Sequence, residues 1–336
     1  MFRYIIRRLF GALLVVIVIS MATFGIFQVG PALSGASPAF LYVGKITTPA
    51  QVAAVEKRLG LDKPYPEQYW LYMKGIVVGR EFTDGDQVVT CEAPCFGYSF
   101  RLNTSVWELM KDRFPVTFSL ALGASILWLF FGISTGVLSA LKRGSVFDRA
   151  AMVVALAGVS LPVFFTGLVL LSIFSYGPEA LQWFPDVHYV PFSENPAEWA
   201  RNLFLPWISL AFLFAALYAR FTRANMLETM SEDYIRTATA KGLKRRTVVT
   251  KHGLRAALTP IVTIFGLDLG ALLGGAILTE STFSLPGLGL LSYNAIATQD
   301  LPIILGVTIL AAIFIVVANV VVDVLYAFID PRVSYS

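Results

Sequence analysis

Apolar residues in this chain gather into runs long enough to cross a lipid bilayer, and polar segments separate the runs. Crossing ~30 Å of hydrocarbon at about 1.5 Å per residue takes roughly 20 residues of helix. Runs of this kind cover Leu9–Val29, Val116–Leu141, Ala150–Phe174, Leu203–Ala219, Ile261–Leu278 and Pro302–Tyr326. The pattern predicts an all-α integral membrane protein with six transmembrane helices, the third of which is interrupted by Pro162.

The first run has two interpretations. Small residues at 32–36 resemble the cleavage site of a secretory signal peptide. The apolar run is, however, longer than the roughly 7–15 residues of a signal core. We therefore expect residues 1–30 to hold a cytoplasmic amino terminus and an uncleaved first span.

A long polar stretch, residues 31–113, follows the first span. The order Thr-Pro-Ala-Gln at 48–51 is typical of a helix start and predicts a helix that ends near Leu59. A second short helix is expected over Pro66–Ile76. Beyond it, the turn signal Asp84-Gly85 between residues of strand type predicts a β-hairpin.

Composition agrees with a membrane protein. Hydrophobic residues make up 56% of the 336 residues and charged residues 14%, against about 25% charged residues in soluble domains. The net charge of +4 therefore concerns membrane topology rather than nucleic acid. Two His and two Cys are too few for a zinc or haem site, so we expect no metal ligands and no bound cofactor.

The basic residues predict the orientation. With the amino terminus inside, the segments on the inner side carry most Lys and Arg, and the two short outer loops hold only Arg201. Both termini then face the cytoplasm, including residues 329–336. Residues 31–113 form a long extracytoplasmic region, and residues 114–328 form the transmembrane domain. A cytoplasmic loop at 221–259 interrupts that domain.

The stretch Glu232–Pro260, which covers most of this loop, differs from the apolar runs on either side. From Arg220 to Arg255 there are nine Lys or Arg against three acids, so the segment must lie outside the hydrocarbon. Gly242 falls between two amphipathic pieces of helical periodicity, as expected of a helix end or tight turn. One interpretation is an ordinary solvated, positive loop, which any multi-span protein carries.

The order of residues in this stretch favours a more specific interpretation. Residues 232–243 read Glu-Asp-Tyr-Ile-Arg-Thr-Ala-Thr-Ala-Lys-Gly-Leu, and Pro-Gly-Leu-Gly at 286–289 and Asp-Pro-Arg at 330–332 follow downstream. These motifs resemble those of binding-protein-dependent ABC importer permeases. The form of the loop motif in this chain is similar to that of the peptide and nickel permease family, and specifically to that of the first of its two permease subunits.

The resemblance implies a type I ABC importer permease fold and import of di- or oligopeptides. Nickel, glutathione or oligosaccharide import by the same architecture stays open. A self-contained secondary transporter is a more remote alternative, because it would predict inverted repeats that are not evident. The implied partners are a second homologous permease subunit, cytoplasmic ABC ATPase subunits and an extracytoplasmic binding protein.

The phosphate-binding sequence of ATPases, Gly-x-x-x-x-Gly-Lys-Ser/Thr, does not occur in the chain. We therefore expect the partner ATPases to use ATP and Mg, and we expect this subunit to hold no catalytic residue. The resemblance makes residues 232–243 an ATPase-coupling loop. Small residues there would allow close approach of the partner, and basic residues would supply ion pairs. The implied coupling residues are Glu232, Asp233, Arg236, Thr237, Ala238, Ala240, Lys241, Gly242 and Leu243.

Two departures from the family pattern matter. Arg236, Thr237 and Ala238 stand where the general importer loop has Glu-Ala-Ala, so a contact through that glutamate does not carry over. Residues 81–95 also form an insertion. We expect Cys91 and Cys95 to form a disulfide at the tip of this inserted finger, and we hypothesise that the finger reaches the binding protein. The alternative is a surface insertion that carries two incidental thiols.

Two features of the fifth run have open roles. Gly266, Gly270 and Gly274 recur every four residues and predict a face for close helix packing, within this chain or against a second permease subunit. Asp268 is an acid inside a span, which makes it a candidate for the substrate path or for a bond to a neighbouring helix.

Overall fold

The computed structural model describes residues 2–30, 39, 48, 56–57, 60–84, 87–184 and 187–329. Among these residues, five helices are long and apolar enough to cross a membrane. They are α1 (Phe2–Phe24, continued by a short π-helix at Gly25–Val29), α6 (Val106–Leu141), α9 (Pro196–Ser231), the helix ending in α12 (Leu254–Leu273) and α15 (Leu301–Ile329).

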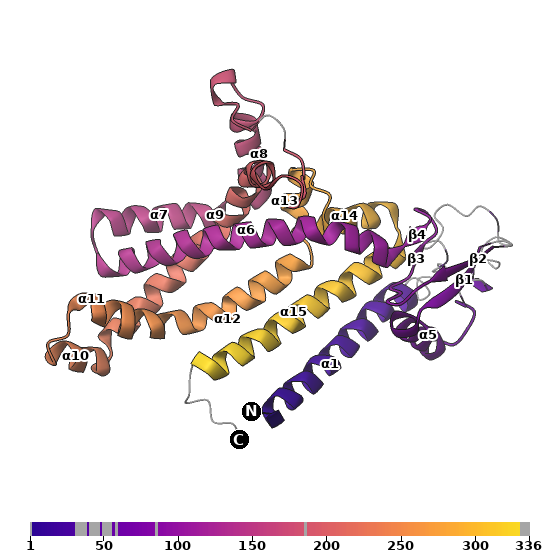
Figure 1. The fold of residues 1–336 in the computed structure, drawn as a ribbon, viewed down its shortest axis with the longest axis horizontal. Helices are drawn as coiled ribbons and strands as arrows, with labels where there is room; N and C mark the ends of the chain where they lie inside the picture. Colours follow the sequence, from indigo (N-terminus) through magenta and orange to yellow (C-terminus); the bar gives the residue numbers. More distant parts are fainter. Residues whose placement is uncertain are drawn as a thin grey trace. The chain divides into compact units, whose positions relative to one another are not determined.

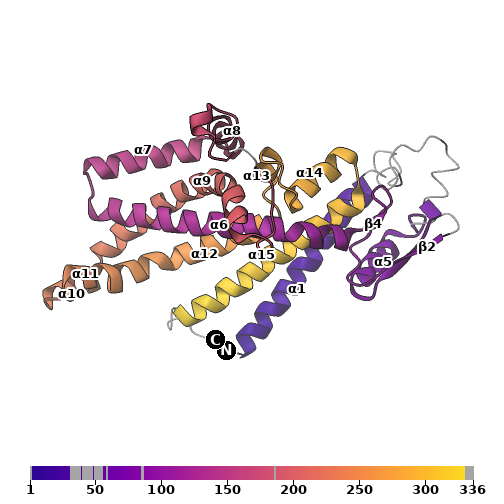
Figure 2. The same ribbon diagram turned by 45° about the horizontal axis from the view of Figure 1, so that its top comes forward.

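A sixth candidate span is broken. Helices α7 (Val146–Ser160) and α8 (Val163–Phe174) meet at an angle of 102° around Pro162. Figure 2 shows that the two helices run in different directions. Counting this pair as one span gives the six predicted from the sequence. The bend is far larger than a hinge within one straight span, because Pro162 precedes α8 with extended dihedral angles and starts a new helix.

The chain folds as two compact units, and the long helices α6 and α15 are each divided between them. The first unit comprises residues 1–117, 273–277 and 286–317. It contains α1, α5 (Tyr65–Val78), a hairpin of β1 (Arg80–Asp84) and β2 (Gln87–Cys91), a small ladder of β3 (Tyr98–Ser99) and β4 (Thr104–Ser105), and α14 (Leu288–Thr298).

In this first unit, α5 lies beside the hairpin, whose strands pair antiparallel from Arg80 opposite Cys91 to Asp84 opposite Gln87 (Figure 1). A buried apolar cluster around Phe96, Val106 and Ile303 joins the start of α6 to α14 and α15. The predicted short helix and hairpin are therefore present. Of the helix predicted at 48–59, all but Thr48, Glu56 and Lys57 lies outside the described residues.

The second unit comprises residues 118–272, 278–285 and 318–336. Helix α9 packs along α7 and α8. Trp128, Leu203, Tyr218 and Met226 are fully buried in it. The unit also contains α10 (Asp233–Ala240), α11 (Arg245–Thr247), the π-helix η3 (Val248–Gly253) and most of α13 (Ile277–Thr282).

Three predicted boundaries were wrong. Helix α6 begins at Val106 rather than Val116, because Ser105 caps the backbone N–H of Glu108 at 3.2 Å. Helix α9 continues past Arg220 to Ser231, so the first third of the predicted loop is helical. The fifth span includes Pro260 within its helix and ends at Leu273 rather than Leu278. It ends there because Gly275 has a φ of +126°.

Candidate coupling site

Helix α10 stands at the end of α9 and is closed by a glycine turn (Figure 2). Gly242 has a φ of +76°, a conformation in which only glycine is unstrained. The N–H of Leu243 donates to the carbonyl of Ala238 at 3.4 Å, and the N–H of Gly242 donates to that of Thr239 at 3.0 Å. These two bonds make a Schellman motif, which satisfies the last carbonyls of α10.

After the turn, the chain enters one continuous helix from Arg245 to Leu273 that includes α11, η3 and α12. Its beginning packs against α10: Ile235, Ala238 and Val248 are buried together, with Met230 of α9 beside them. Ala238 therefore faces its own chain, and the expectation that it lets a partner approach closely was wrong. Its position three residues after Ile235 puts both side chains on the inner face of α10.

A second cluster fixes η3 to the transmembrane helices. Val249 is buried with Ala140 of α6, Met226 of α9 and Ala257 of α12. Packed interiors resist gradual deformation, so a displacement of α10 and η3 has to be passed on to the ends of these helices. The element is therefore mechanically joined to the spans and is not a loose loop.

The outer face of the element carries the other predicted residues. Arg236 and Asp233 form an ion pair at 3.4 Å, but their side chains are 74% and 96% exposed. Such a pair contributes little to stability, and both charges stay accessible to a partner. Exposed residues of the predicted set are Glu232, Asp233, Arg236, Thr237, Ala240, Lys241, Gly242 and Leu243.

Two apolar side chains stand among these charges. Tyr234 is 45% exposed and Leu243 is 41% exposed, one near each end of α10. Partial burial, together with the nearby Glu232 carboxylate, raises the pKa of Tyr234, so its hydroxyl stays protonated. The sequence prediction missed Tyr234. The sequence did contain a sign of it: Tyr234 is an aromatic residue next to the inward-facing Ile235, at a position where an amphipathic helix normally has a polar residue.

Inside the membrane-spanning helices of the second unit, Asp268 accepts a hydrogen bond from the hydroxyl of Tyr218 at 2.8 Å. The bond links α12 to α9. Gly266 lies against α15, where an added Cβ would come within 1.9 Å of Val322 Cγ2. Gly270 is buried on the same helix, whereas Gly274 is the first residue after it and is only half-buried.

A buried ion pair near the α6–α7 turn escaped the sequence prediction. Arg223 donates from Nε to Asp148 Oδ1 at 2.7 Å and from a terminal nitrogen to Oδ2 at 2.8 Å. Ser139 also donates to Oδ1, and the N–H of Gly144 donates to Oδ2 at 2.9 Å. Asp148 thus holds α6, α7 and α9 together. The sequence offered one sign of this ion pair, because Asp148 is a single acidic residue within a basic turn.

In the first unit, Cys91 and Cys95 form a disulfide with Cα atoms 5.6 Å apart. Both are buried with Phe82 and Tyr98, at the base of the hairpin. The expected position at the tip was wrong, because Cys91 pairs with Arg80, at the opposite end of the strands from the pair Asp84 and Gln87. The described residues include no group of three or more His, Cys, Asp or Glu placed to hold a metal.

The fold and the coupling site define a class of protein. Apolar helices long enough to span a bilayer, joined by an exposed and anchored helical element outside the spans, are the architecture of a multi-pass membrane protein. The chain belongs to the family of binding-protein-dependent transport system inner membrane components, which matches residues 132–335. The amino-terminal part of these membrane components matches residues 1–121.

Relatives are similar along the whole length. A protein named as a peptide transport system permease in Brucella abortus (strain 2308) is 37% identical over 335 residues, which cover 99% of each chain. The dipeptide transport system permease protein DppB of Alkalihalophilus pseudofirmus is 36% identical and covers 100% of each chain. The glutathione transport system permease protein GsiC of Escherichia coli (strain K12) is 35% identical, also over 100% of each chain.

These matches confirm the family predicted from residues 232–243 and the permease function. The chain is a multi-pass inner-membrane permease subunit of an ABC importer. Members of this family work with ATPase and binding-protein partners.

Proposed function

We propose that this permease subunit translocates short peptides and pairs with a second homologous permease subunit. Peptide, dipeptide and glutathione permeases are all similar to it, and glutathione is itself a tripeptide. Short peptides are therefore the class that these names share. ATP and Mg are used by the partner ATPases, and this chain binds neither.

The observation that carries the coupling role is the anchored element at residues 232–253. Its outer face presents charges together with Tyr234 and Leu243, and its inner face is packed into the ends of α6, α9 and α12. A soluble ATPase docked on the outer face would move the spans when it closes on ATP. Glu232 and Asp233 supply acidic contacts in place of the glutamate missing from the general motif.

Transport by the assembled complex tests the substrate class. The complex is reconstituted in liposomes with its binding protein, and uptake of labelled di-, tri- and tetrapeptides is compared with uptake of glutathione and Ni²⁺. We expect ATP-dependent uptake of peptides that unlabelled peptides compete away. Uptake of Ni²⁺ without competition by peptides would contradict the proposal.

The coupling role also requires a cytoplasmic position for the element, which the basic residues support. A cysteine at Thr247 should be shielded from an impermeant thiol reagent in intact cells, and one at Ser193 should be labelled. The pair Cys91–Cys95 provides the internal reference, since a disulfide does not react. The reverse labelling would contradict both the orientation and ATPase docking.

The inserted hairpin at residues 81–95 supports contact with the binding protein. The disulfide and its aromatic neighbours fix the base, while Val88 near the tip is 62% exposed. Deleting 83–88 and closing the strands with Asn-Gly keeps the base intact. We expect uptake to fall while ATPase activity without binding protein stays unchanged. Unchanged uptake would rule out this role.

A further inference from the structure

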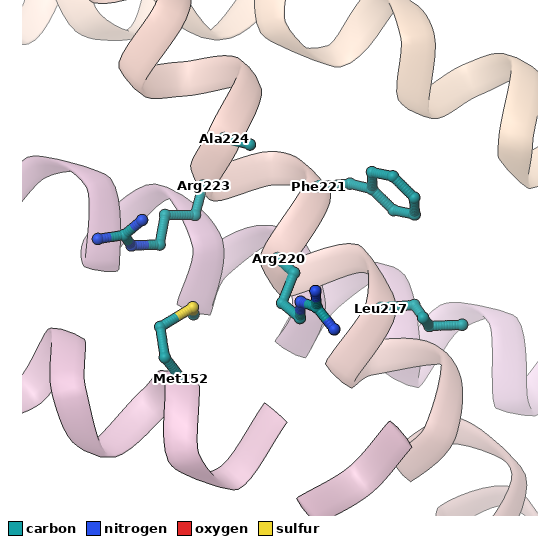
Figure 3. A pocket seen from close by; sticks show the side chains of 6 residues that line it. All are labelled: Met152, Leu217, Arg220, Phe221, Arg223 and Ala224. Carbon is teal, nitrogen blue, oxygen red and sulfur yellow. The ribbon is translucent and has the colours of Figure 1, made fainter. Parts of the chain in front are cut away.

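A cavity of about 380 Å³ opens between α7 and α9 in the second unit. Leu217, Arg220, Phe221 and Ala224 line it from one face of α9, and Met152 lines it from α7. Figure 3 shows the side chains of Arg220 and Arg223 on either side of Met152. The lining is thus apolar except for two guanidinium groups.

The two arginines differ in their partners. Arg223 is neutralised by its two hydrogen bonds to Asp148. Arg220 is exposed, and no carboxylate within the described part of the chain pairs with it. In the sequence, residues 118–178 and 199–227 contain a single acid, which is Asp148. The cavity therefore carries one positive charge that the protein does not balance.

The cavity lies where a membrane protein meets lipid headgroups. Arg220 is the first basic residue after the apolar run at 203–219, so it marks one end of that span. Phe221 beside it is exposed, as are Val153 and Val154 on α7 next to Met152. Exposed apolar side chains on a membrane-spanning helix are covered by acyl chains. The same end of α7 carries the exposed Arg149.

We propose that this cavity binds an anionic phospholipid. The Arg220 guanidinium takes the headgroup phosphate, whose oxygens match its planar array of donors. The acyl chains lie along Phe221 and the exposed valines of α7. Basic pockets between transmembrane helices bind anionic lipid headgroups in this manner. The proposal requires only that the spans cross a bilayer and holds for any transported substrate.

Native mass spectrometry of the intact transporter in mild detergent tests the site. The probes are dioleoyl-phosphatidylglycerol and, as a zwitterionic control, dioleoyl-phosphatidylcholine. Arg220→Gln should weaken retention of phosphatidylglycerol about fivefold, the contribution of one cation near an anionic surface. Arg201→Gln, at the other end of α9, is the matched control and should retain the lipid as the wild type does.

A second variant tests the cavity without changing charge. Met152→Trp places a larger side chain in the lining and should also reduce phosphatidylglycerol retention. Elution of each variant as the intact complex on size-exclusion chromatography shows that assembly is preserved. Equal retention by Arg220→Gln and Arg201→Gln, or equal binding of the two lipids by the wild type, would overturn the proposal.

Two further outcomes would reassign the site. If glycerol 3-phosphate competes as well as the diacyl lipid, the cavity recognises a water-soluble phosphate ester. If Arg220→Cys, labelled with a photoactivatable maleimide, becomes crosslinked to the second permease subunit when membranes are irradiated, that subunit covers the face. Either result contradicts lipid binding, and neither bears on whether the transporter imports peptides.

Discussion

Gly242 offers the sharpest test of the coupling element, because its two possible roles predict different results. Its φ of +76° costs an alanine about 1–2 kcal/mol. An added Cβ would meet no atom of the chain within 4 Å, so backbone strain is the whole cost in the isolated subunit. Asparagine adopts this conformation with far less strain and adds a larger side chain.

A penalty of 1–2 kcal/mol lowers the equilibrium constant for forming the closed turn about 5- to 30-fold. If docking requires that turn, the apparent affinity for the ATPase subunits falls by up to the same factor. We therefore expect Gly242→Ala to need a higher ATPase concentration, by a factor of up to about 30, and Gly242→Asn to stay near the wild type. Gly242→Asp should remain in the membrane but uncouple uptake from hydrolysis, because it adds an acid beside Lys241 and Lys244.

The assay titrates purified ATPase subunits into proteoliposomes that contain the permease pair, and it measures both binding-protein-stimulated ATP hydrolysis and peptide uptake. Equal impairment of Gly242→Ala and Gly242→Asn would show that close approach of the partner, and not the turn, requires glycine. Wild-type values for all three variants would refute the coupling role of this turn.

Three other perturbations follow from the structure. Asp148→Asn leaves the partly buried Arg223 unpaired and should destabilise the detergent-purified protein by about 3 kcal/mol in thermal unfolding. The double variant with Arg223→Gln should lose less stability than the sum of the losses in the two single variants. Replacing Cys91 and Cys95 by Ser should destabilise the first unit by about 2 kcal/mol, and a melting curve that is insensitive to reductant in the wild type would contradict this. Burial raises the pKa of the Asp300 carboxyl, although that carboxylate accepts a hydrogen bond from a serine hydroxyl. The folded state therefore binds the proton more tightly than the unfolded state does. The free energy of unfolding should fall as the pH rises from the ordinary pKa of 3.8 through the raised pKa. Asp300→Asn should remove that pH dependence.

Much of the architecture follows from local sequence. The spans were predictable because hydrocarbon thickness sets helix length, and Gly242 was predictable as a turn because a helix end favours glycine. The boundaries of α6 and α9 were less predictable from the sequence. Both helices continue past their apolar runs, and their more polar ends at 106–113 and 222–231 keep helical geometry without an apolar run to reveal it.

The parts that escaped prediction depend on contacts distant in sequence or on side-chain direction. Ala238 looked available to a partner until Val248 was found to cover it. The disulfide could be paired from spacing, but its burial at the hairpin base depends on the strand register. Asp148 and Arg223 are 75 residues apart, and no local pattern joins them.

That separation has a consequence for biogenesis. Translation adds about 5–20 residues per second, so Asp148 leaves the ribosome roughly 4–15 s before Arg223. During this interval the carboxylate would sit at the membrane boundary without its cation. Ser139 and the N–H of Gly144 lie within nine residues of Asp148 and emerge before it. They can hold the acid in place while α7 inserts, and the arrival of α9 then closes the three-helix assembly.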